Sequence, residues 1–467
     1  MNKEETICAI ATAPGGAIGL IRVSGPDAID IVDQIFTTKT NINLNHRKAN
    51  TITFGYIKSD NATILDEVLV SLFKAPHSYT GEDSIEISCH GSRYIMQQII
   101  QLLIAHGCRA ATPGEYTKRA FLNQKIDLCQ AEAVADLIAA NSAATHRMAM
   151  NQIRGGVSHE LSVLRDKLLH LTSLLELELD FSDHEELEFA DRSELKSLSH
   201  HIQSKMKQLA DSFSTGNALK NGVPVAIAGE TNAGKSTLLN TLLNEDKAIV
   251  SDIHGTTRDT IEDTTVIDGI TFRFIDTAGI RRTNDVIEAM GIERSYKAID
   301  QARIVILLSD ITREEEDLRN FYSNIKSHLA HKDVILAMNK QDNADNTTKA
   351  TIPQFIDQTS ANSWNAITIS AKMGRNIDSL RSLLINLAGI SNIANNDVIL
   401  TNIRHYEALT RALDAINRVI YGLDLNLSAD LIAQDLRDCI YHLNDILGEV
   451  TTDEVLSNIF KHFCIGK

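Results

Sequence analysis

The chain has 467 residues, a formal net charge of -16 and six cysteines, and its length suits about three domains of ordinary size. The acidic balance argues against a broad nucleic-acid-binding surface, so an RNA partner would have to use a local patch of lysines and arginines. No apolar run reaches the roughly 18 residues of a membrane span, and residues 1–17 lack an export signal, so we expect a cytoplasmic protein. The cysteines lack zinc spacing, so we expect reduced, mostly buried thiols.

Residues 1–118 predict an α+β module. Two helical stretches, 28–36 and 93–106, alternate with short β-forming runs at 6–11, 18–23, 51–57, 68–73 and 84–88. Glycine and proline predict turns at 14–16 and 113–114.

Residues 119–220 predict the first part of an all-α helical domain. Apolar residues recur at helical spacing, at Val157, Leu161, Leu164, Leu168, Leu171 and Leu175. The acidic stretch 176–188 at the end of this helix is interpreted as a solvated face in preference to a metal site.

Residues 229–236, GETNAGKS, form a complete Gly-x-x-x-x-Gly-Lys-Ser phosphate loop. An apolar strand, 223–228, precedes it and a helix, 235–243, follows, as such a loop requires. The two glycines allow backbone amides to converge on the β- and γ-phosphates. Lys235 would reach the phosphate oxygens, and the Ser236 hydroxyl is the expected Mg²⁺ ligand.

Three further motifs follow apolar runs in the order typical of a guanine-nucleotide GTPase. They are DTAG at 276–279, NKQD at 339–342 and SAK at 370–372. Asp276 would hold Mg²⁺ through water, and the Gly279 amide would sense the γ-phosphate. Asp342 would accept hydrogen bonds from N1 and N2 of guanine, a pair of donors that adenine lacks.

Residues 221–380 are therefore predicted to be a Ras-like, doubly wound α/β domain. The dipeptide Asp268-Gly269 between two β-forming runs predicts a hairpin and one antiparallel edge.

Residues 381–467 predict the second part of the helical domain. Apolar residues at helical spacing run from Ile403 to Ile420 and from Ile432 to Ile446, and Thr451 with Glu454 predicts a capping box for a last short helix. Amphipathic helices on both sides of the GTPase segment need a partner for their apolar stripe. We expect one bundle into which that segment is inserted, the alternative being two separate helical units.

The chain ends in Cys-Ile-Gly-Lys at 464–467. This terminus, GTTRD at 255–259 and the inserted GTPase domain resemble the MnmE (TrmE) tRNA-modification GTPases. The resemblance covers the whole length and includes IRVSG at 21–25, YTGED at 79–83, PGEY at 113–116 and RAFLN at 119–123.

The resemblance implies a joint reaction with the flavoprotein MnmG. It would form a 5-carboxymethylaminomethyl or aminomethyl group on the wobble uridine of certain tRNAs, with glycine or ammonium as nitrogen donor. The implied one-carbon source is 5,10-methylenetetrahydrofolate, with 5-formyltetrahydrofolate as its analogue. The matching folate-site residues are Arg22, Glu86, Lys125 and Lys467. Cations suit the carboxylates of a folate tail, and Glu86 could accept hydrogen bonds from the amino-pyrimidine ring.

The resemblance also implies an assembly. It comprises a homodimer through the N-terminal domain, contact between GTPase domains when GTP is bound, and a heterotetramer with MnmG.

The same resemblance implies a K⁺-activated GTPase. Ile280 stands where Ras-like enzymes have a water-orienting glutamine, and Glu288 would take that role through a bridging water. K⁺ would replace an arginine finger, held by Asn232, Ser251, Ile253 and Thr256, and Thr257 would join Ser236 on Mg²⁺. The predicted GTP-binding residues are Asn232, Ala233, Gly234, Lys235, Ser236, Thr237, Ser251, Asp252, Ile253, His254, Gly255, Thr256, Thr257, Asp276, Thr277, Ala278, Gly279, Asn339, Lys340, Asp342, Ser370, Ala371 and Lys372.

Two positions depart from the family pattern. Thr231 stands where the phosphate loop usually has proline, and the segment 11–17 is one residue shorter than in the family and lacks its arginine.

Cys464 is assigned a catalytic role near the folate or uridine, because neighbouring cations could lower its pKa; the alternative is a tail cysteine without chemistry.

Two alternative functions make different demands on the sequence. A ribosome-assembly GTPase of the Era or Der kind would carry an RNA-binding KH module or a second GTPase domain, and the sequence shows neither. A purely regulatory GTPase would use its N-terminal module only to dimerise. Binding of a reduced folate by residues 1–125 distinguishes that function from modification chemistry.

Overall fold

The structure is a computed structural model that describes residues 5–39, 43–59, 61, 63–180, 192–230, 232–244, 263–275, 296–313, 315–343, 364–389, 398–450, 452–461, 463 and 466. The chain forms two compact units. The first comprises Met1–Ile138, Gln152–Gln203 and Ala408–Lys467, and the second comprises Ala139–Asn151 and Ser204–Glu407.

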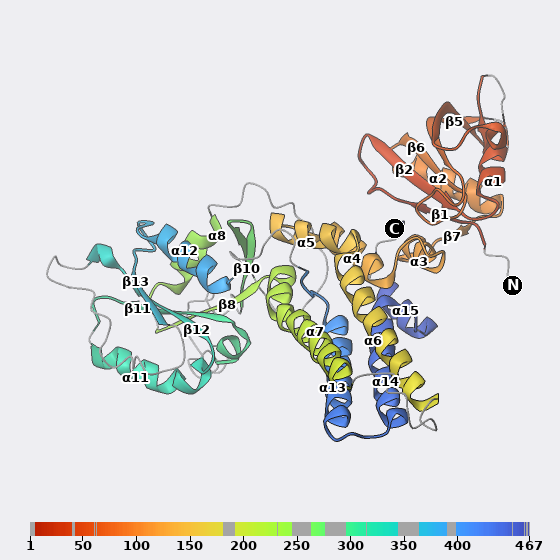
Figure 1. Ribbon diagram of the computed structural model, residues 1–467. Coiled ribbons are helices and arrows are strands. Elements are labelled where there is room, and N and C mark those ends of the chain that lie inside the picture. Colours follow the sequence, from red (N-terminus) through yellow and green to blue (C-terminus); the bar gives the residue numbers. More distant parts are fainter. Residues whose placement is uncertain are drawn as a thin grey trace. The chain divides into compact units, whose positions relative to one another are not determined.

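The N-terminal part of the first unit is built on a seven-stranded sheet in the order β3-β4-β5-β6-β2-β1-β7. Only the pair β1 and β7 is parallel. The strands are β1 (Ile7–Ile10), β2 (Ile18–Ser24), β3 (Phe36–Thr37), β4 (Thr51–Lys58), β5 (Ile64–Phe73), β6 (Ser84–His90) and β7 (Arg109–Ala110). The predicted α+β module is confirmed (Figure 1).

Two helices, α1 (Ala28–Ile35) and α2 (Arg93–Ala105), pack against one face of this sheet. Alternate strand residues such as Ile85 and Ile87 are buried in the apolar cluster between sheet and helices. On the other face Ile18, Phe54 and Leu69 are 68%, 52% and 45% exposed. The sheet therefore has one covered face and one open face that carries large apolar side chains.

Helices from both sides of the GTPase segment form one bundle, as predicted (Figure 1). Helix α6 (Gly156–Asp180) is joined to α14 (Ala429–Leu447) by an ion pair of 3.0 Å between Glu176 and Arg437. Helix α7 (Arg192–Asn221) is joined to α13 (Ile403–Asp424) by a 2.5 Å hydrogen bond from Gln203 to Asn417. Helices α4 (Leu128–Ala139) and α15 (Asp453–Phe460) belong to the first unit. Helix α5 (Ala143–Ile153) lies almost wholly in the second unit, where Ala144 and Met148 pack against its core. Among the described residues, no helix has the length and apolar character needed to span a bilayer.

Two local features differ from the sequence predictions. Helix α3 (Glu115–Leu122) starts directly after Gly114, where the sequence predicted only a turn. Gly114 has φ 68°, and a Cβ there would lie 2.8 Å from the Phe460 carbonyl oxygen, so a distant contact defines this helix start. Thr451 of the predicted capping box lies outside the described residues. The described cap of α15 is Thr452, whose Oγ1 accepts from the Val455 amide at 3.4 Å.

The second unit holds a six-stranded sheet in the order β13-β12-β11-β8-β10-β9. Its strands are β8 (Val223–Gly229), β9 (Asp263–Ile267), β10 (Ile270–Phe274), β11 (Ile304–Asp310), β12 (Asp333–Asn339) and β13 (Trp364–Thr368). The β9–β10 edge is antiparallel and turns at Asp268 and Gly269, whose φ angles are 50° and 76°. All other neighbours are parallel, which confirms the doubly wound prediction.

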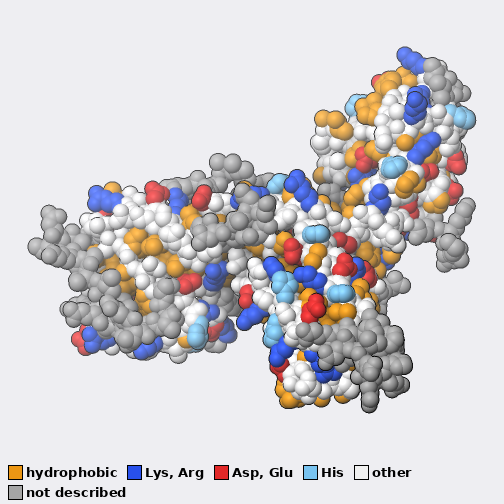
Figure 2. Space-filling view, viewed as in Figure 1, with side chains coloured by type: hydrophobic (Ala, Val, Ile, Leu, Met, Phe, Trp, Pro, Cys, Tyr) orange, Lys and Arg blue, Asp and Glu red, His pale blue; other side chains and the backbone are white. Residues whose placement is uncertain are grey.

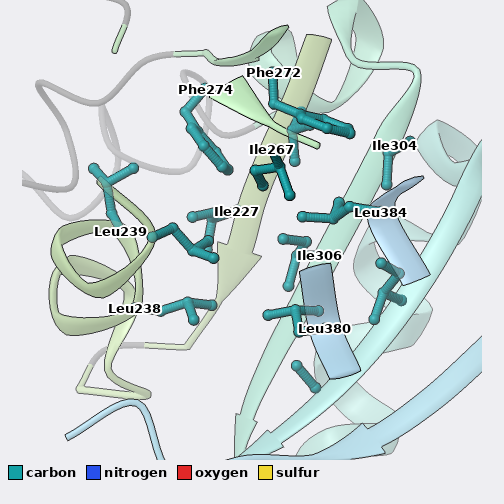
Figure 3. Close-up of a cluster of buried hydrophobic side chains, with 14 of the residues drawn as sticks. Ile227, Leu238, Leu239, Ile267, Phe272, Phe274, Ile304, Ile306, Leu380 and Leu384 are labelled. Atoms are coloured by element: carbon teal, nitrogen blue, oxygen red, sulfur yellow. The ribbon is translucent and has the colours of Figure 1, made fainter. Parts of the chain in front are cut away.

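Both faces of this sheet are buried. Figure 3 shows one face, where Ile227, Phe272 and Phe274 meet side chains of α8 (Lys235–Asn244) and α12 (Ile377–Ala388). On the other face Ala226 and Ala228 join a cluster that includes Ile325 at the end of α11 (Glu315–Ile325). Burial on both sides explains why these strands appear in the sequence as continuous apolar runs.

A buried ion network holds α3 against the N-terminal sheet. Glu115 accepts hydrogen bonds from Arg109 at 2.5 and 3.1 Å and from Arg119 at 3.0 Å, and Arg119 also donates to Glu82 at 3.0 Å. Burial alone would raise the pKa of Glu115, but the hydrogen bonds from Arg109, the Thr112 amide and Arg119 lower it to about 2. This carboxylate is therefore ionised over almost the whole pH range.

Because the folded pKa of Glu115 lies below its ordinary value of 4.5, its stabilising effect is complete above about pH 4.5 and is lost as the pH falls towards 2. We predict that Glu115→Gln destabilises α3 by about 2 kcal/mol at pH 7. Hydrogen exchange of the α3 amides should show this difference at pH 7, and it should shrink by pH 3. Glu5→Gln is the control, since Glu5 is 68% exposed and also pairs with Arg109. Equal effects of the two substitutions at pH 7 would contradict the prediction.

Candidate functional site

The phosphate loop lies at the carboxyl edge of the parallel sheet, between β8 and α8. Strand β8 has β11 on one side and β10 on the other, so this is the point where the strand order reverses and where such folds bind ligands. Asn232 and Gly234 have φ angles of 64° and 99°. A Cβ on Gly234 would lie 2.3 Å from Nδ2 of Asn339, and one on Gly229 would lie 2.2 Å from the Leu308 carbonyl oxygen. Both positions therefore require glycine.

Lys235 points back along the loop. Its Nζ donates to the carbonyl oxygens of Gly229 at 2.7 Å and Glu230 at 2.8 Å. Burial lowers the pKa of this ammonium, and the charge of Glu230 opposes the shift. A phosphate oxygen would supply the negative charge that a half-buried ammonium favours. Ser236 and Thr237 follow in the first turn of α8.

Asn339 of the NKQD motif makes hydrogen bonds to both the phosphate loop and the SAK motif. It ends β12 and is only 3% exposed. Its Nδ2 donates to the Ala233 carbonyl oxygen of the phosphate loop at 2.8 Å, and its Oδ1 accepts from the Ala371 amide at 3.0 Å. Three loops that are far apart in the sequence are thereby held in one arrangement.

Asp342 has the properties expected of a base-recognising carboxylate. The Ser370 hydroxyl donates to its Oδ1 at 2.5 Å. That hydrogen bond is the main cause that lowers the pKa of Asp342, with further contributions from the charges of Lys372 and Arg375. The group is therefore an ionised acceptor, suited to the paired N–H donors of guanine.

The N-terminal module brings two of its predicted folate residues together. Arg22 and Glu86 are direct partners across β2 and β6, and Arg22 Nε and Nη2 donate to Glu86 Oε1 at 3.0 and 2.7 Å. Arg22 Nη1 donates to the Gly466 carbonyl oxygen at 3.1 Å, which places this part of the chain terminus beside the pair. Lys125 donates to the Pro76 carbonyl oxygen at 2.9 Å and lies apart from the pair's hydrogen bonds.

Two family models match the chain. The model of the GTP-binding protein TrmE N-terminus matches residues 6–125, and that of the MnmE helical domain matches residues 128–464. The chain belongs to the MnmE family. Family membership and the nucleotide site together make it a GTP hydrolase with a role in tRNA modification.

Relatives within the MnmE family match end to end. The chain is 62% identical over 464 residues to the tRNA modification GTPase MnmE of Parabacteroides distasonis, covering 99% of this chain and 100% of that protein. It is 60% identical over 466 residues to that of Bacteroides fragilis, covering 100% of both. Among solved structures, Era of Aquifex aeolicus bound to GDP·AlF4⁻ is 26% identical, covering 41% of this chain and 65% of that chain with a TM-score of 0.28.

Several residues predicted for the MnmE-family site lie outside the described residues. They are Ser251, Asp252, Ile253, His254, Gly255, Thr256, Thr257, Asp276, Thr277, Ala278, Gly279, Glu288, Cys464 and Lys467. The five described cysteines are buried, as predicted, and no disulfide joins any two of them.

Sequence reasoning missed Asp310. This residue ends β11 and accepts a 2.7 Å hydrogen bond from Lys340 of the NKQD motif. A usable signal was present, because Asp310 directly follows an apolar run and the carboxyl ends of parallel strands meet at one edge of the sheet.

We predict that Asp342→Asn lowers the affinity for GTP by about a hundredfold, because the amide presents a donor where guanine needs an acceptor. The affinity for xanthosine triphosphate, which has a carbonyl oxygen at position 2, should rise. Competition against a fluorescent nucleotide measures both constants. Ser370→Ala is the control, since it removes only the supporting hydroxyl and should weaken GTP less. A variant that still preferred GTP over xanthosine triphosphate would contradict this assignment.

Proposed function

We propose that the chain acts with MnmG to form the 5-carboxymethylaminomethyl or aminomethyl group on the wobble uridine of tRNAs in the cytoplasm. One observation supports this most directly. The same chain carries a phosphate loop joined to the NKQD motif through Asn339 and, in its N-terminal module, a half-buried Arg22–Glu86 pair next to Gly466. The named relatives are tRNA modification GTPases, which agrees with a nucleotide switch joined to a modification site.

The Arg22–Glu86 pair suits one end of a reduced folate. Both hydrogen bonds from Arg22 to Glu86 go to Oε1 of that carboxylate, and Oε2 accepts none from the described residues. Tyr79 and Tyr116 flank the guanidinium at 5.9 and 5.7 Å from their ring centres. We infer that Arg22 orients Glu86, whose second oxygen would accept from the amino-pyrimidine ring, while Lys125 and Lys467 would face the folate tail. The bound folate would supply the one-carbon unit.

The position of Gly466 also bears on Cys464. Its hydrogen bond to Arg22 fixes a point two residues from Cys464 beside the proposed folate site. Cys464 itself lies outside the described residues, and we propose that its thiol acts near the folate or uridine.

We predict that Glu86→Gln lowers the affinity for 5-formyltetrahydrofolate at least about tenfold, because a charged acceptor for the ring donors is lost. Isothermal titration of the full chain measures the affinity, and nucleoside analysis of tRNA from complemented deletion cells should show loss of the modified uridine. Ser88→Ala, two residues along the same strand, is the control and should bind normally. Light scattering checks that both variants keep the oligomeric state. No folate binding by the unmodified chain would favour the purely regulatory function.

The open face of the N-terminal sheet supports the proposed homodimer. Ile18, Ile52, Phe54 and Leu69 are all exposed in the single chain, between 45% and 68%. Large apolar side chains gathered on one sheet face mark an interaction surface. We propose that the N-terminal module of a second copy covers this face. The GTPase domains of the two copies would contact each other only when GTP is bound.

The surface charge agrees with a shared tRNA contact. In the view of Figure 2, Lys and Arg side chains are interspersed with Asp and Glu over the helical segments. A mixed surface on a chain of net charge -16 binds phosphate backbones weakly. We propose that MnmG supplies much of the tRNA contact.

The GTPase centre would use two cations. Ser236 and Thr257 would ligate Mg²⁺, which neutralises the phosphates. Asn232 is exposed at the tip of the phosphate loop, and its amide makes no hydrogen bond within the described part of the chain. It therefore has an oxygen available for K⁺, which would add positive charge beside the phosphates. Ser251, Ile253 and Thr256 would complete that shell, and Glu288 would orient the water.

We predict that the chain hydrolyses GTP at least about tenfold faster in potassium than in sodium buffer of equal ionic strength, since an arginine finger is replaced by an ion of suitable size. Asn232→Ala should lose most of this acceleration. Turnover under saturating GTP is the measurement, with choline chloride as the reference that contains no alkali-metal ion. Equal rates in the two salts would exclude the proposed ion site.

A further inference from the structure

The last residue of β11, Asp310, presents a fixed carboxylate to the NKQD motif. Asp310 is the Cα partner of Asn339 across the parallel pair β11 and β12, and its side chain is only 15% exposed. Its Oδ1 accepts from the Thr312 amide at 3.0 Å and from the Thr312 hydroxyl at 2.8 Å. The carboxylate is therefore oriented before any ligand binds.

The other oxygen of this carboxylate holds Lys340. The distance from Lys340 Nζ to Asp310 Oδ2 is 2.7 Å, and the Lys340 side chain is 32% exposed. Lys340 also has a left-handed backbone, φ 65°, which is unfavourable for a residue with a Cβ. The ion pair and the backbone together turn a flexible side chain towards β11.

The turn that follows β11 also contacts the phosphate loop. The Ile311 amide donates to the Asn339 carbonyl oxygen at 3.0 Å. Arg313 Nε lies 3.8 Å from a carboxylate oxygen of Glu230. Residues 310–313 thus contact both the NKQD loop and the phosphate loop, and a nucleoside must lie between these two loops.

We propose that Asp310 is a positioning residue for the guanine nucleotide. By holding the Lys340 ammonium it makes the four-carbon stem of Lys340 a preformed wall of the base pocket. Without it, Lys340 regains its rotamers and must be ordered when the nucleotide binds. This role rests on the guanine-nucleotide site described above and is separate from recognition of the base edge, which belongs to Asp342.

This role makes a specific prediction about coupling. Asp310 acts only through Lys340, so removing either side chain should have nearly the same effect as removing both. If Asp310 only stabilised the Thr312 turn, the losses of nucleotide affinity in the two single variants would multiply in the double variant. Because the stem would touch the ring face, inosine and guanosine nucleotides should lose affinity equally.

The experiment is a double-mutant cycle on the full chain with Asp310→Asn, Lys340→Met and the double variant. Affinities for GDP, GTP and inosine triphosphate are measured by competition against a fluorescent nucleotide. We expect each single variant to bind about tenfold more weakly, from loss of one charge-assisted contact, and the double variant to bind no more weakly than either. The ratio of the affinities for GTP and inosine triphosphate should not change in any of the three variants. Asp310→Glu, which keeps the charge, should recover part of the affinity.

Thr312→Val is the matched control, since it removes one hydrogen bond to Asp310 and leaves the Lys340 pair. It should change affinity less than about threefold. Unchanged affinity in Asp310→Asn, multiplying effects in the double variant, or an equal loss in Thr312→Val would each overturn the proposal. Lys340→Met leaves the turn intact, so it gives an answer even if Asp310→Asn lowers the folded fraction. Failure of the unmodified chain to bind GTP would instead refute the nucleotide site itself.

Discussion

The buried carboxamide of Asn339 holds the nucleotide site together. It connects the phosphate loop through the Ala233 carbonyl oxygen and the loop after β13 through the Ala371 amide. Both hydrogen bonds are shielded from water, so losing one partner would leave a buried polar group unsatisfied. The contact is possible only because Gly234 has no side chain at the point where Asn339 approaches. Glycine in the phosphate loop is thus required twice, for its positive φ and for this close approach.

The two sheets differ in how many of their faces are covered by helices. In the GTPase sheet, helices cover both faces, and Ile227 and Ala228 enter separate clusters on opposite sides. In the N-terminal sheet, α1 and α2 cover one face and leave Phe54 and Leu69 exposed on the other. The first arrangement is complete within one chain. The second exposes an apolar surface of the kind that partners cover, which is why we assign dimerisation to it.

A residue near the C-terminal end of the chain contacts the N-terminal sheet. Helices α6 and α14, which flank the GTPase segment, pack side by side in one bundle. Beyond the bundle, Gly466 reaches Arg22, 444 residues away in sequence. Gly466 has φ 92°, and a Cβ there would lie 2.7 Å from the Ile10 carbonyl oxygen. Gly466 is therefore packed against the N-terminal sheet, beside the proposed folate site.

The sequence predicted features that depend on neighbouring residues. The strands β8 and β12, the Asp268–Gly269 hairpin and the order of the phosphate-loop and NKQD motifs follow from local apolar runs, turn residues and spacing. The helical stripes likewise predicted that α6 and α14 need partners.

Only the tertiary structure decided which distant side chains meet. Helix α3 was missed because it is stabilised by Arg119 and Glu82, which are far apart in sequence. The pairing of Arg22 with Glu86 depends on the register of β2 and β6, and that of Asp310 with Lys340 on the register of β11 and β12. Register is determined by packing of whole strands against their neighbours, so no local pattern in one segment contains it.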